Sequence, residues 1–573
     1  MRGRVGLQGV VLLSLLVLAA EVGAAGAVEL VWVFLRDKVD DQGARVAWDD
    51  SPDPRPAAAL DLAVVPGYVA ILGPLVQEVR AISRWLNAVS VVATEPQVIQ
   101  LRGLPFVRGV TPVGRYARSP VPTPPEPDPT ASGKDAGTAL PEYGVSYAQL
   151  AQLHVTDLHL LGYQGAGIRI ALLDDGFHHS HRCFSGLRVA AARDFINGDD
   201  DVTDQDGQPV TGDETRTVQN LHGAQVLSLL AGNDPDRFVG VAPEAEYILA
   251  KTEEYATELP VEEDRWVAGL EWADSLGARV VNSSLGYNLW DDGSGYTWAQ
   301  MDGATAVTTR AAEIAVQRGI VVVAAAGNEG DNAWQYVTAP ADGPGVISVG
   351  AVDLPQPGLR DPVLAASSSR GPTADGRIKP DVVAPGQFVV VAEVRGSDYQ
   401  RASGTSYAAP LVSGVCALLL QAHPPWTPAQ VQQALRETAT DLGPAGPDTA
   451  YGWGQVNALA ASGMELPVPE ESRVAAPFPN PVRGDRIFFP LSLASAGTVQ
   501  LQIYELSGAL VATVFDGRLA EGIYVDPDRA LHWDLNDEEA DRGVRLANGL
   551  LLYRLTVAGI ERQGKLALLR PSR

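Results

Sequence analysis

The middle of the chain, from about residue 142 to residue 462, alternates short apolar runs with stretches of helical periodicity. Unbroken apolar runs bounded by turn residues are typical of strands buried on both faces. The predicted strands are 168–173, 247–251, 279–282, 319–326 and 346–352, and the predicted helices are 223–230 and 307–318. This alternation predicts parallel βαβ units, and therefore an α/β domain with a doubly wound, mostly parallel sheet.

The two flanking regions have other patterns. Residues 28–118 combine strand-like runs with a weakly helical stretch at 76–86, which predicts a small α+β domain. Residues 477–573 contain strand-like runs separated by turn residues, which predict an all-β sandwich. The predicted strands of these regions are 29–35, 88–93, 106–113, 486–491, 499–506, 510–515, 530–533, 550–557 and 565–570.

Two proline-containing stretches separate the three regions. Residues 119–141 begin SPVPTPPEPDPTA, and proline is too frequent there for a helix or a central strand. We expect an exposed linker with polyproline II character, open to proteolysis. Residues 463–476 form the second predicted linker.

The amino terminus has the pattern of a secretory signal. Arg2 and Arg4 precede an apolar run at 10–20, and an A-x-A cleavage pattern ends at Ala27. The apolar run is too short to cross about 30 Å of hydrocarbon as a helix. We therefore expect residues 1–27 to be a cleaved signal peptide and the mature protein to be secreted, without a membrane span; an uncleaved anchor is the alternative.

The charge and cysteine content exclude several classes of function. Lys and Arg total 43 against 69 Asp and Glu, a net charge of −26, so the surface repels phosphate backbones and nucleic acid is not expected as a partner. Two cysteines are too few for a disulfide framework or a four-cysteine zinc site. Cys183 and Cys416 are expected to be two buried thiols, with a single bridge as the alternative.

Three segments of the middle domain place a polar residue beside a glycine at the end of an element. ALLDDGF places Asp174 at the end of a strand, LHGAQVLSLLAG places His222 at the start of a helix, and ASGTSYAAPLVSGV places Ser406 where a loop becomes a helix. An acid, an imidazole and a hydroxyl are the minimal set for nucleophilic acyl transfer. The serine needs a base, and the base needs an anion that fixes its tautomer.

The order Asp, His, Ser resembles that of the subtilisin-like serine protease (subtilase) family, and the resemblance covers about residues 142–462. It implies a serine endopeptidase that acts through an acyl-enzyme, with protein or peptide substrates. Asp174 would orient the base, His222 would act as general base and acid, and Ser406 would be the nucleophile. In AAAGNEG, Asn328 resembles the asparagine with which the family stabilises the oxyanion, together with the Ser406 amide.

The resemblance also extends to substrate binding. VVNSSLGY resembles the strand along which the family pairs an extended peptide, as in β-augmentation. The stretch at 324–327 would wall the pocket for the residue before the cut. The residues that the resemblance assigns to substrate binding are Ser284, Leu285, Gly286, Ala325, Ala326 and Gly327.

Three residues depart from the family pattern. Asp175 replaces a small or hydroxyl residue, Ala224 replaces a threonine and Tyr407 replaces a methionine. Successive strand residues point to opposite faces, so the charge of Asp175 is not expected to reach His222. If it did, it would raise the pKa of the imidazole and shift the working pH upward. The alternatives are a catalytically silent exported binding protein on the same scaffold, and an esterase that uses the same residues.

No metal ligands are assigned. The acidic run NGDDDVTDQD at 197–206 offers the oxygen ligands that Ca²⁺ prefers but lacks the EF-hand spacing, so a solvated loop is favoured and a structural Ca²⁺ is left open. His178, His179 and His181 are close in sequence, yet no acidic or cysteine partner has a zinc spacing, and a structural use of His181 is favoured. No organic cofactor is expected.

Both flanking regions also resemble known modules. SRWLNAVSVVAT and LPFVRGVTPV resemble pro-regions of secreted bacterial subtilases, which implies an intramolecular inhibitor removed by cleavage between Tyr116 and Tyr143. An ordinary accessory domain is the alternative. PFPNPVRGDRIFF and VQLQIYELSGALV resemble immunoglobulin-like (FlgD-like) modules and type IX secretion sorting domains, without distinguishing a sorting tag from a stabilising or attachment domain. We expect Trp533 and Tyr553 to belong to the core of this module.

Overall fold

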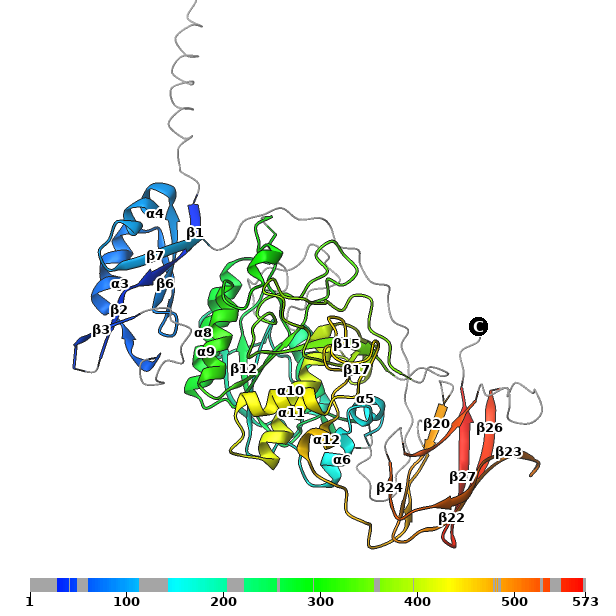
Figure 1. Cartoon of the computed structure of the whole chain (residues 1–573). Coiled ribbons are helices and arrows are strands. Elements are labelled where there is room, and N and C mark those ends of the chain that lie inside the picture. The colour runs from blue at the N-terminus through cyan, green and yellow to red at the C-terminus, as the bar shows by residue number, and fades with distance from the viewer. Residues whose placement is uncertain are drawn as a thin grey trace, which may run out of the picture. The chain divides into compact units, whose positions relative to one another are not determined.

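The computed structural model describes most of the chain (Figure 1). It covers residues 28–112, 143–203, 221–354 and 361–569, apart from gaps at 41, 49–59, 236, 255–257, 292, 395, 478–479, 481, 483–485, 526–528 and 536–547. The expected signal peptide at 1–27 and the expected linker at 119–141 lie outside the described residues. The chain divides into two units, Met1–Gly114 and Arg115–Arg573, and each is described by itself.

The amino-terminal unit is built on a four-stranded antiparallel sheet in the order β5-β6-β1-β7. Apolar side chains of the sheet and of two helices form its core. Its elements are β1 Val28–Leu35, β2 Asp37–Val39, β3 Arg45–Ala47, β4 Ala63–Val64, α3 Pro66–Leu72, η1 Gly73–Leu75, β5 Glu78–Ser83, β6 Ala88–Thr94, α4 Glu95–Arg102 and β7 Val107–Pro112.

The prediction of a helix at 76–86 is wrong, because this segment contains strand β5. β5 pairs with β6, with which it forms a hairpin, and Asn87 at the turn has a positive φ of 47°. Pairing with a buried neighbouring strand outweighs the weak local helical preference. The helix forms instead at α4, where Thr94 and Gln97 make a capping box.

The second unit contains a seven-stranded sheet in the order β16-β15-β14-β13-β8-β12-β9, and every pairing in it is parallel. This confirms the predicted α/β domain with a parallel sheet. The central strands are buried along their whole length because helices and loops cover both faces. The strands are β8 Arg169–Asp174, β9 Val189–Asp194, β12 Glu246–Lys251, β13 Val280–Ser283, β14 Val321–Ala325, β15 Ile347–Asp353 and β16 Val382–Gln387.

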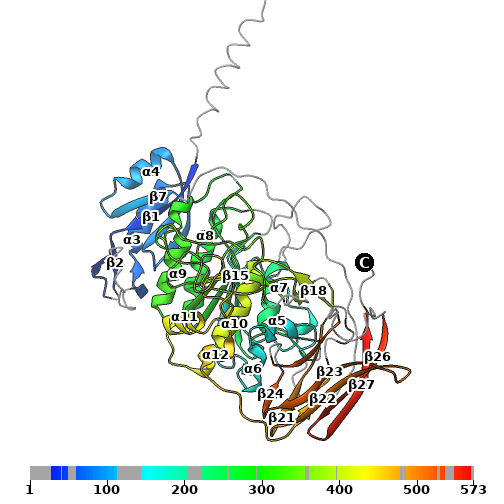
Figure 2. The same ribbon diagram turned by 45° about the vertical axis from the view of Figure 1, so that its right-hand side comes forward.

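The helices of this domain pack on the sheet and on one another. Helices α8 and α9 lie side by side in both views (Figures 1 and 2), and α10 packs along β13 to β16 and against α7. The helices are α5 Tyr147–Ala151, α6 Val155–Leu160, α7 Leu221–Ala231, α8 Val261–Ser275, α9 Val307–Gln317, α10 Thr405–Ala422, α11 Pro428–Glu437 and α12 Ala458–Ser462. The remaining short elements are η2 Arg182–Phe184, β10 Asn233–Asp234, β11 Phe238–Val239, η3 Trp298–Gln300, β17 Val389–Ala392 and β18 Tyr399–Ala402.

Helix α10 is long and apolar enough, by composition alone, to cross a membrane. Its position accounts for this composition, because 78% of the helix is buried inside the domain. Cys416 lies in this helix, and both it and Cys183 are buried, free thiols, which confirms the expectation of two thiols over a single bridge. Burial raises the pKa of Cys183 to about 12, so this thiol is not poised for reaction.

The carboxyl-terminal region is β-rich. A four-stranded antiparallel sheet in the order β23-β22-β26-β27 faces a core that includes Trp533 and Tyr553. The strand predicted at 486–491 is divided at Pro490, which has no N–H for a ladder. The strands are β19 Arg473–Val474, β20 Arg486–Phe489, β21 Leu491–Leu493, β22 Gly497–Glu505, β23 Leu510–Leu519, β24 Gly522–Tyr524, β25 Leu531–Asp534, β26 Gly549–Val557 and β27 Ile560–Leu568.

Candidate active site

The carboxyl ends of the central strands form the edge of the sheet at which polar residues gather. Asp174 is the last residue of β8 and is fully buried. His222 lies in the first turn of α7, and its Nδ1 is 2.7 Å from Oδ1 of Asp174. This is a charge-assisted hydrogen bond, in which the carboxylate holds the imidazole with its proton on Nδ1 and leaves Nε2 to accept a second proton.

Gly223 permits this close approach of helix and strand. A Cβ atom at this position would lie 2.2 Å from the carbonyl oxygen of Gly176 and 3.0 Å from Cβ of Asp174. Any larger residue would therefore push α7 away from the end of β8. The glycine that follows His222 in the sequence is a packing requirement of the His222–Asp174 contact.

Ser406 lies in the first turn of α10, after Gly404, whose φ of 147° disfavours other residues. The Ser406 hydroxyl donates to the carbonyl oxygen of Ser284 at 3.0 Å. In return, the Ser284 hydroxyl donates to the carbonyl oxygen of Ser406 at 2.7 Å. In this resting arrangement the Ser406 hydroxyl proton is directed to Ser284, so it must turn toward Nε2 of His222 before the imidazole can accept it.

A chain of buried side chains holds this turn in place. Asn282 Nδ2 donates to Ser284 Oγ at 3.0 Å, and Ser413 Oγ donates to Asn282 Oδ1 at 2.8 Å. Asn282 is on β13 and Ser413 is two turns into α10. The hydrogen bonds therefore join the strand to the helix immediately behind Ser406, and they limit how far its backbone can move.

Asn328 follows β14 and faces the same turn. Its Oδ1 accepts hydrogen bonds from the backbone N–H of Thr405 at 2.9 Å and from the Thr405 hydroxyl at 3.1 Å. With the carbonyl side of the amide held in this way, the Nδ2 group is left to donate elsewhere. Asn328 and Ser406 line one cleft, so this donor and the amide of Ser406 are available to an oxyanion formed between them.

The cleft has a volume of about 300 Å³ and brings together most of the residues expected from the sequence. Ala326 does not line it: this residue is fully buried, and its N–H donates to the carbonyl oxygen of Val349 in the neighbouring strand. Asp174 is also absent from the wall because it lies behind His222. The expected residues that line the cleft are His222, Ser284, Leu285, Gly286, Ala325, Gly327, Asn328 and Ser406.

The expectation that Asp175 would not approach His222 is wrong. β8 ends at Asp174, so the alternation of a strand does not continue, and Asp175, Asp174 and His222 each contribute an atom within 4.8 Å of the others. Asp175 Oδ1 accepts the backbone N–H of Gly223 at 2.8 Å. Burial and the neighbouring Asp174 raise the pKa of Asp175 well above its usual value.

Two opposing effects set the proton affinity of His222. Burial lowers the pKa of its imidazole. The charge and hydrogen bond of Asp174 and the charge of Asp175 raise this pKa by more than burial lowers it, so that the pKa of His222 rises to about 9. The ring of Tyr407, a departure from the family pattern, lies 5.6 Å from the imidazole, and its hydroxyl donates to Gln225 at 2.7 Å. Tyr407 therefore forms part of the surroundings of His222 without replacing a catalytic atom.

Sequence reasoning missed most of the acidic groups on the cleft wall. The pair Glu253-Glu254 follows the strand predicted at 247–251 after one intervening residue, Thr252, and this position near a carboxyl end was the available signal. The others come from a loop and from the residue after Asn328, where nothing local marks them. The carboxylates that line the cleft are Asp175, Glu253, Glu254, Glu258 and Glu329.

The histidine run and the acidic loop have structural roles in the part of the chain that the structure describes. His181 bonds through Nδ1 to the Cys183 thiol at 3.1 Å and through Nε2 to the carbonyl oxygen of Asp398 at 2.9 Å. In the acidic loop, Asp201 Oδ1 accepts the backbone N–H of Thr203 at 3.0 Å, and the buried Lys251 ammonium donates to the carbonyl oxygen of Thr203 at 2.9 Å. These contacts assign no ligand set for Ca²⁺, and positions 204–206 of the loop lie outside the described residues.

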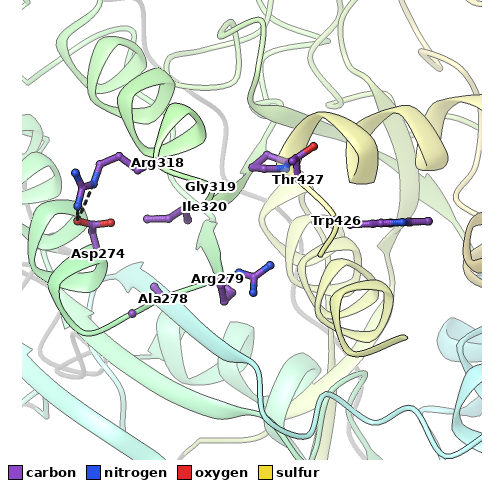
Figure 3. Close-up of a pocket in the computed structure, with 10 residues that line it drawn as sticks. Asp274, Ala278, Arg279, Arg318, Gly319, Ile320, Trp426 and Thr427 are labelled. Carbon is purple, nitrogen blue, oxygen red and sulfur yellow. Dashed lines mark hydrogen bonds and ion pairs between the residues drawn. The ribbon is translucent and has the colours of Figure 1, made fainter. Parts of the chain in front are cut away.

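A second cavity, of about 400 Å³, lies at the opposite edge of the sheet, where β13 and β14 begin (Figure 3). Its single carboxylate, Asp274, is paired with Arg318 at 2.7 Å. The residues that line it include a hydroxyl at Thr427 but no histidine, so it contains no base for a nucleophile. The cleft with His222 and Ser406 is therefore the candidate active site.

The chain is similar to proteins of one known family. Residues 165–454 match the Subtilase family, and residues 54–124 match the Peptidase S8 propeptide domain of Bacteroidota. Over 323 residues the chain is 33% identical to Subtilisin E of Bacillus subtilis, which covers 56% of this chain and 71% of that protein. It is also 33% identical to Subtilisin of Bacillus pumilus, over 56% of this chain and 98% of that protein. Subtilisin Savinase of Lederbergia lenta is 30% identical over 55% of this chain and 97% of its own length.

Proposed function

Because the chain belongs to the subtilase family and is a serine-type endopeptidase, we propose that Asp174, His222 and Ser406 are its catalytic triad. The assignment depends on the 2.7 Å hydrogen bond between His222 Nδ1 and Asp174 Oδ1, together with the fact that His222 and Ser406 line the same cleft. The catalytically silent alternative rested on Asp175 and Ala224 alone, and neither of these residues replaces Asp174, His222 or Ser406.

The mechanism follows from the roles of these groups. The Ser406 oxygen attacks the carbonyl carbon of the scissile bond while His222 Nε2 takes the hydroxyl proton. The resulting oxyanion accepts hydrogen bonds from Asn328 Nδ2 and the Ser406 amide at the amino terminus of α10. His222 then gives its proton to the leaving amine as the C–N bond breaks, and water hydrolyses the ester to release the acid and restore Ser406.

The amino-terminal unit is proposed as an intramolecular inhibitor of this cleft. The match of residues 54–124 to a subtilase propeptide domain supports the assignment. We propose that it is removed by self-cleavage between Tyr116 and Tyr143, in the proline-rich stretch that the sequence predicts to be an exposed linker. Export is proposed from the propeptide and from the signal-like residues 1–27, and the β-rich carboxyl-terminal region is proposed as an immunoglobulin-like module for sorting or attachment.

Replacement of Asn328 tests the proposed oxyanion site. In Asn328→Ala we expect kcat to fall by about 10²- to 10³-fold, as for the equivalent donor in subtilisin, with KM nearly unchanged. The donor acts on charge that develops only in the transition state. Asn328→Asp is the matched variant, because it keeps the oxygen that accepts from Thr405 and loses the N–H donor. The measurement is steady-state hydrolysis of a peptide amide. A kcat within threefold of the wild-type value in either variant would contradict the role of Asn328.

The pH dependence of kcat/KM tests the environment of His222. The imidazole must be neutral to accept the Ser406 proton, so kcat/KM should rise with pH, reach half of its plateau near pH 9, the pKa of His222, and level off above that pH. Asp175→Asn keeps an acceptor for Gly223 N–H and removes a negative charge that raises this pKa. The rising limb of the profile should therefore move to lower pH. An unchanged profile would show that Asp175 does not act on His222.

A further inference from the structure

The charged side chains that line the cleft are mainly acidic. Of the described residues that line it, five are carboxylic acids and none is a lysine or an arginine. An enclosed cleft of one sign focuses its field and raises the local concentration of the opposite charge. The cleft is therefore organised to receive positive charge.

Among the described residues, two of these carboxylates accept hydrogen bonds from neutral groups. Glu254 pairs with Arg265 at 2.9 Å. Glu253 is held instead by neutral donors: the Tyr287 hydroxyl donates to its Oε1 at 2.5 Å and the Thr252 hydroxyl donates at 3.1 Å. Glu329 also accepts from a neutral group, the side-chain amide of Asn332. A positive group that enters the cleft would thus meet two carboxyl groups, those of Glu253 and Glu329, that accept hydrogen bonds from neutral groups.

Asp175 provides an independent observation. Its side chain is among the cleft-lining groups although the residue is only 4% exposed. One carboxylate oxygen accepts from Gly223, but the other, Oδ2, is buried and has no hydrogen-bond partner in the described residues. A buried carboxylate oxygen without a donor is unfavourable, and a donor that reaches it from the cleft relieves this cost.

We propose that the cleft selects peptides with arginine or lysine side chains beside the scissile bond, and that Asp175 and Glu253 are its specificity-determining residues. The inference rests on the proposed function of the cleft and specifies its substrate class. Both residues line the same cleft as His222, Ser284 and Ser406, so a peptide bound across Ser406 would place side chains in the cleft that contains them. Glutamate or aspartate at the same peptide positions would be rejected by like charge.

The proposal includes a dependence on pH. Burial raises the pKa of Glu253 to about 8, and the charges of neighbouring acids add to the rise, whereas the two hydroxyl donors oppose it. Glu253 therefore gains its negative charge as the pH increases through about 8, and the preference for a cationic side chain should increase over the same range. The titratable groups that face Glu253 are Asp174 from β8, Glu258 from the following loop, Tyr287 after β13, and Glu262 and Glu263 from α8.

Matched peptides test the proposal with the processed full-length enzyme. Fluorogenic peptides carry either arginine or citrulline, its neutral analogue of the same shape, at each of several positions around the scissile bond. At one or more positions we expect kcat/KM to be about tenfold higher for arginine at pH 9 and low salt, and the ratio should fall with added NaCl and at pH 7. Ratios within twofold at every position would overturn the proposal.

Charge-removing variants assign the effect to residues. Asp175→Asn and Glu253→Gln keep the side-chain volume and should each lower the arginine-to-citrulline ratio by about threefold or more. Glu437→Gln, at an exposed position at the end of α11, is the control and should leave the ratio unchanged. Equal arginine-to-citrulline ratios in all three variants would show that Asp175 and Glu253 do not determine the specificity. If the wild type cleaves no peptide faster than Ser406→Ala does, the proposed function itself fails, whereas equal cleavage of the paired peptides rejects only the specificity.

Discussion

Ser406→Ala is expected to lower kcat for a peptide substrate by about 10⁶-fold, the size of this effect in subtilisin. The substitution removes the atom that forms the acyl-enzyme and leaves the oxyanion donors and the cleft in place. His222→Ala should cost nearly as much, because a serine hydroxyl without its base is a weak nucleophile. The double variant should be no slower than either single variant, since the two residues act as one unit.

The control for this series is Ser275→Ala. Ser275 is an exposed serine at the end of α8, and its hydroxyl donates to the carbonyl oxygen of Trp272. Its replacement should leave kcat within the error of the wild type. The measurement is steady-state hydrolysis of a fluorogenic peptide by equal amounts of folded protein. A Ser406→Ala variant that kept 1% of the wild-type rate would contradict the role of Ser406.

Asp174→Asn should have the next largest effect, a fall in kcat of about 10⁴-fold, as for the corresponding aspartate of chymotrypsin-like enzymes. Asp174 Oδ1 accepts from His222 Nδ1 and from the Asp175 backbone N–H. An amide can present an N–H to the imidazole, which stabilises the tautomer that cannot take the Ser406 proton. The variant also loses the charge that stabilises the imidazolium during attack.

The pH profile separates this explanation from general destabilisation. Without the charge of Asp174, the pKa of His222 falls, so the rising limb of kcat/KM should move to lower pH while the plateau stays low. Asp175→Asn is the matched control, because it removes the neighbouring charge and keeps Asp174; its kcat should fall far less. Similar losses of kcat in the two variants would contradict the assignment of Asp174 as the residue that orients the imidazole.

The arrangement of the domain was predictable where the pattern along the chain was strong. The unbroken apolar runs at 168–173, 319–326 and 346–352 became the buried strands β8, β14 and β15. Strand β9, VAAARD, was not predicted, because it is an edge strand with exposed positions and has no apolar run. The misassigned segment at 76–86 is similar: its conformation depends on the partner strand and not on its own residues.

The candidate triad could be proposed because each of its residues lies within two positions of a glycine where a strand ends or a helix begins, and in a parallel α/β sheet these places meet at one edge. The position of the Asp175 side chain could not be predicted from the sequence, because its direction depends on the exact residue at which β8 ends. The hydrogen bond from Ser406 to Ser284 joins residues 122 positions apart. The acidic wall likewise combines three distant segments that the chain pattern does not connect.

The central claim is that Ser406 is a nucleophile activated by His222. Labelling with a fluorophosphonate tests it directly, because the reagent forms a bond between phosphorus and an activated serine oxygen and releases fluoride. Peptide mapping by mass spectrometry of the processed enzyme should find one label, on Ser406, and His222→Ala should lose it. A fully active peptidase that carries the label on another residue, or Ser406 labelled equally well without His222, would contradict the account.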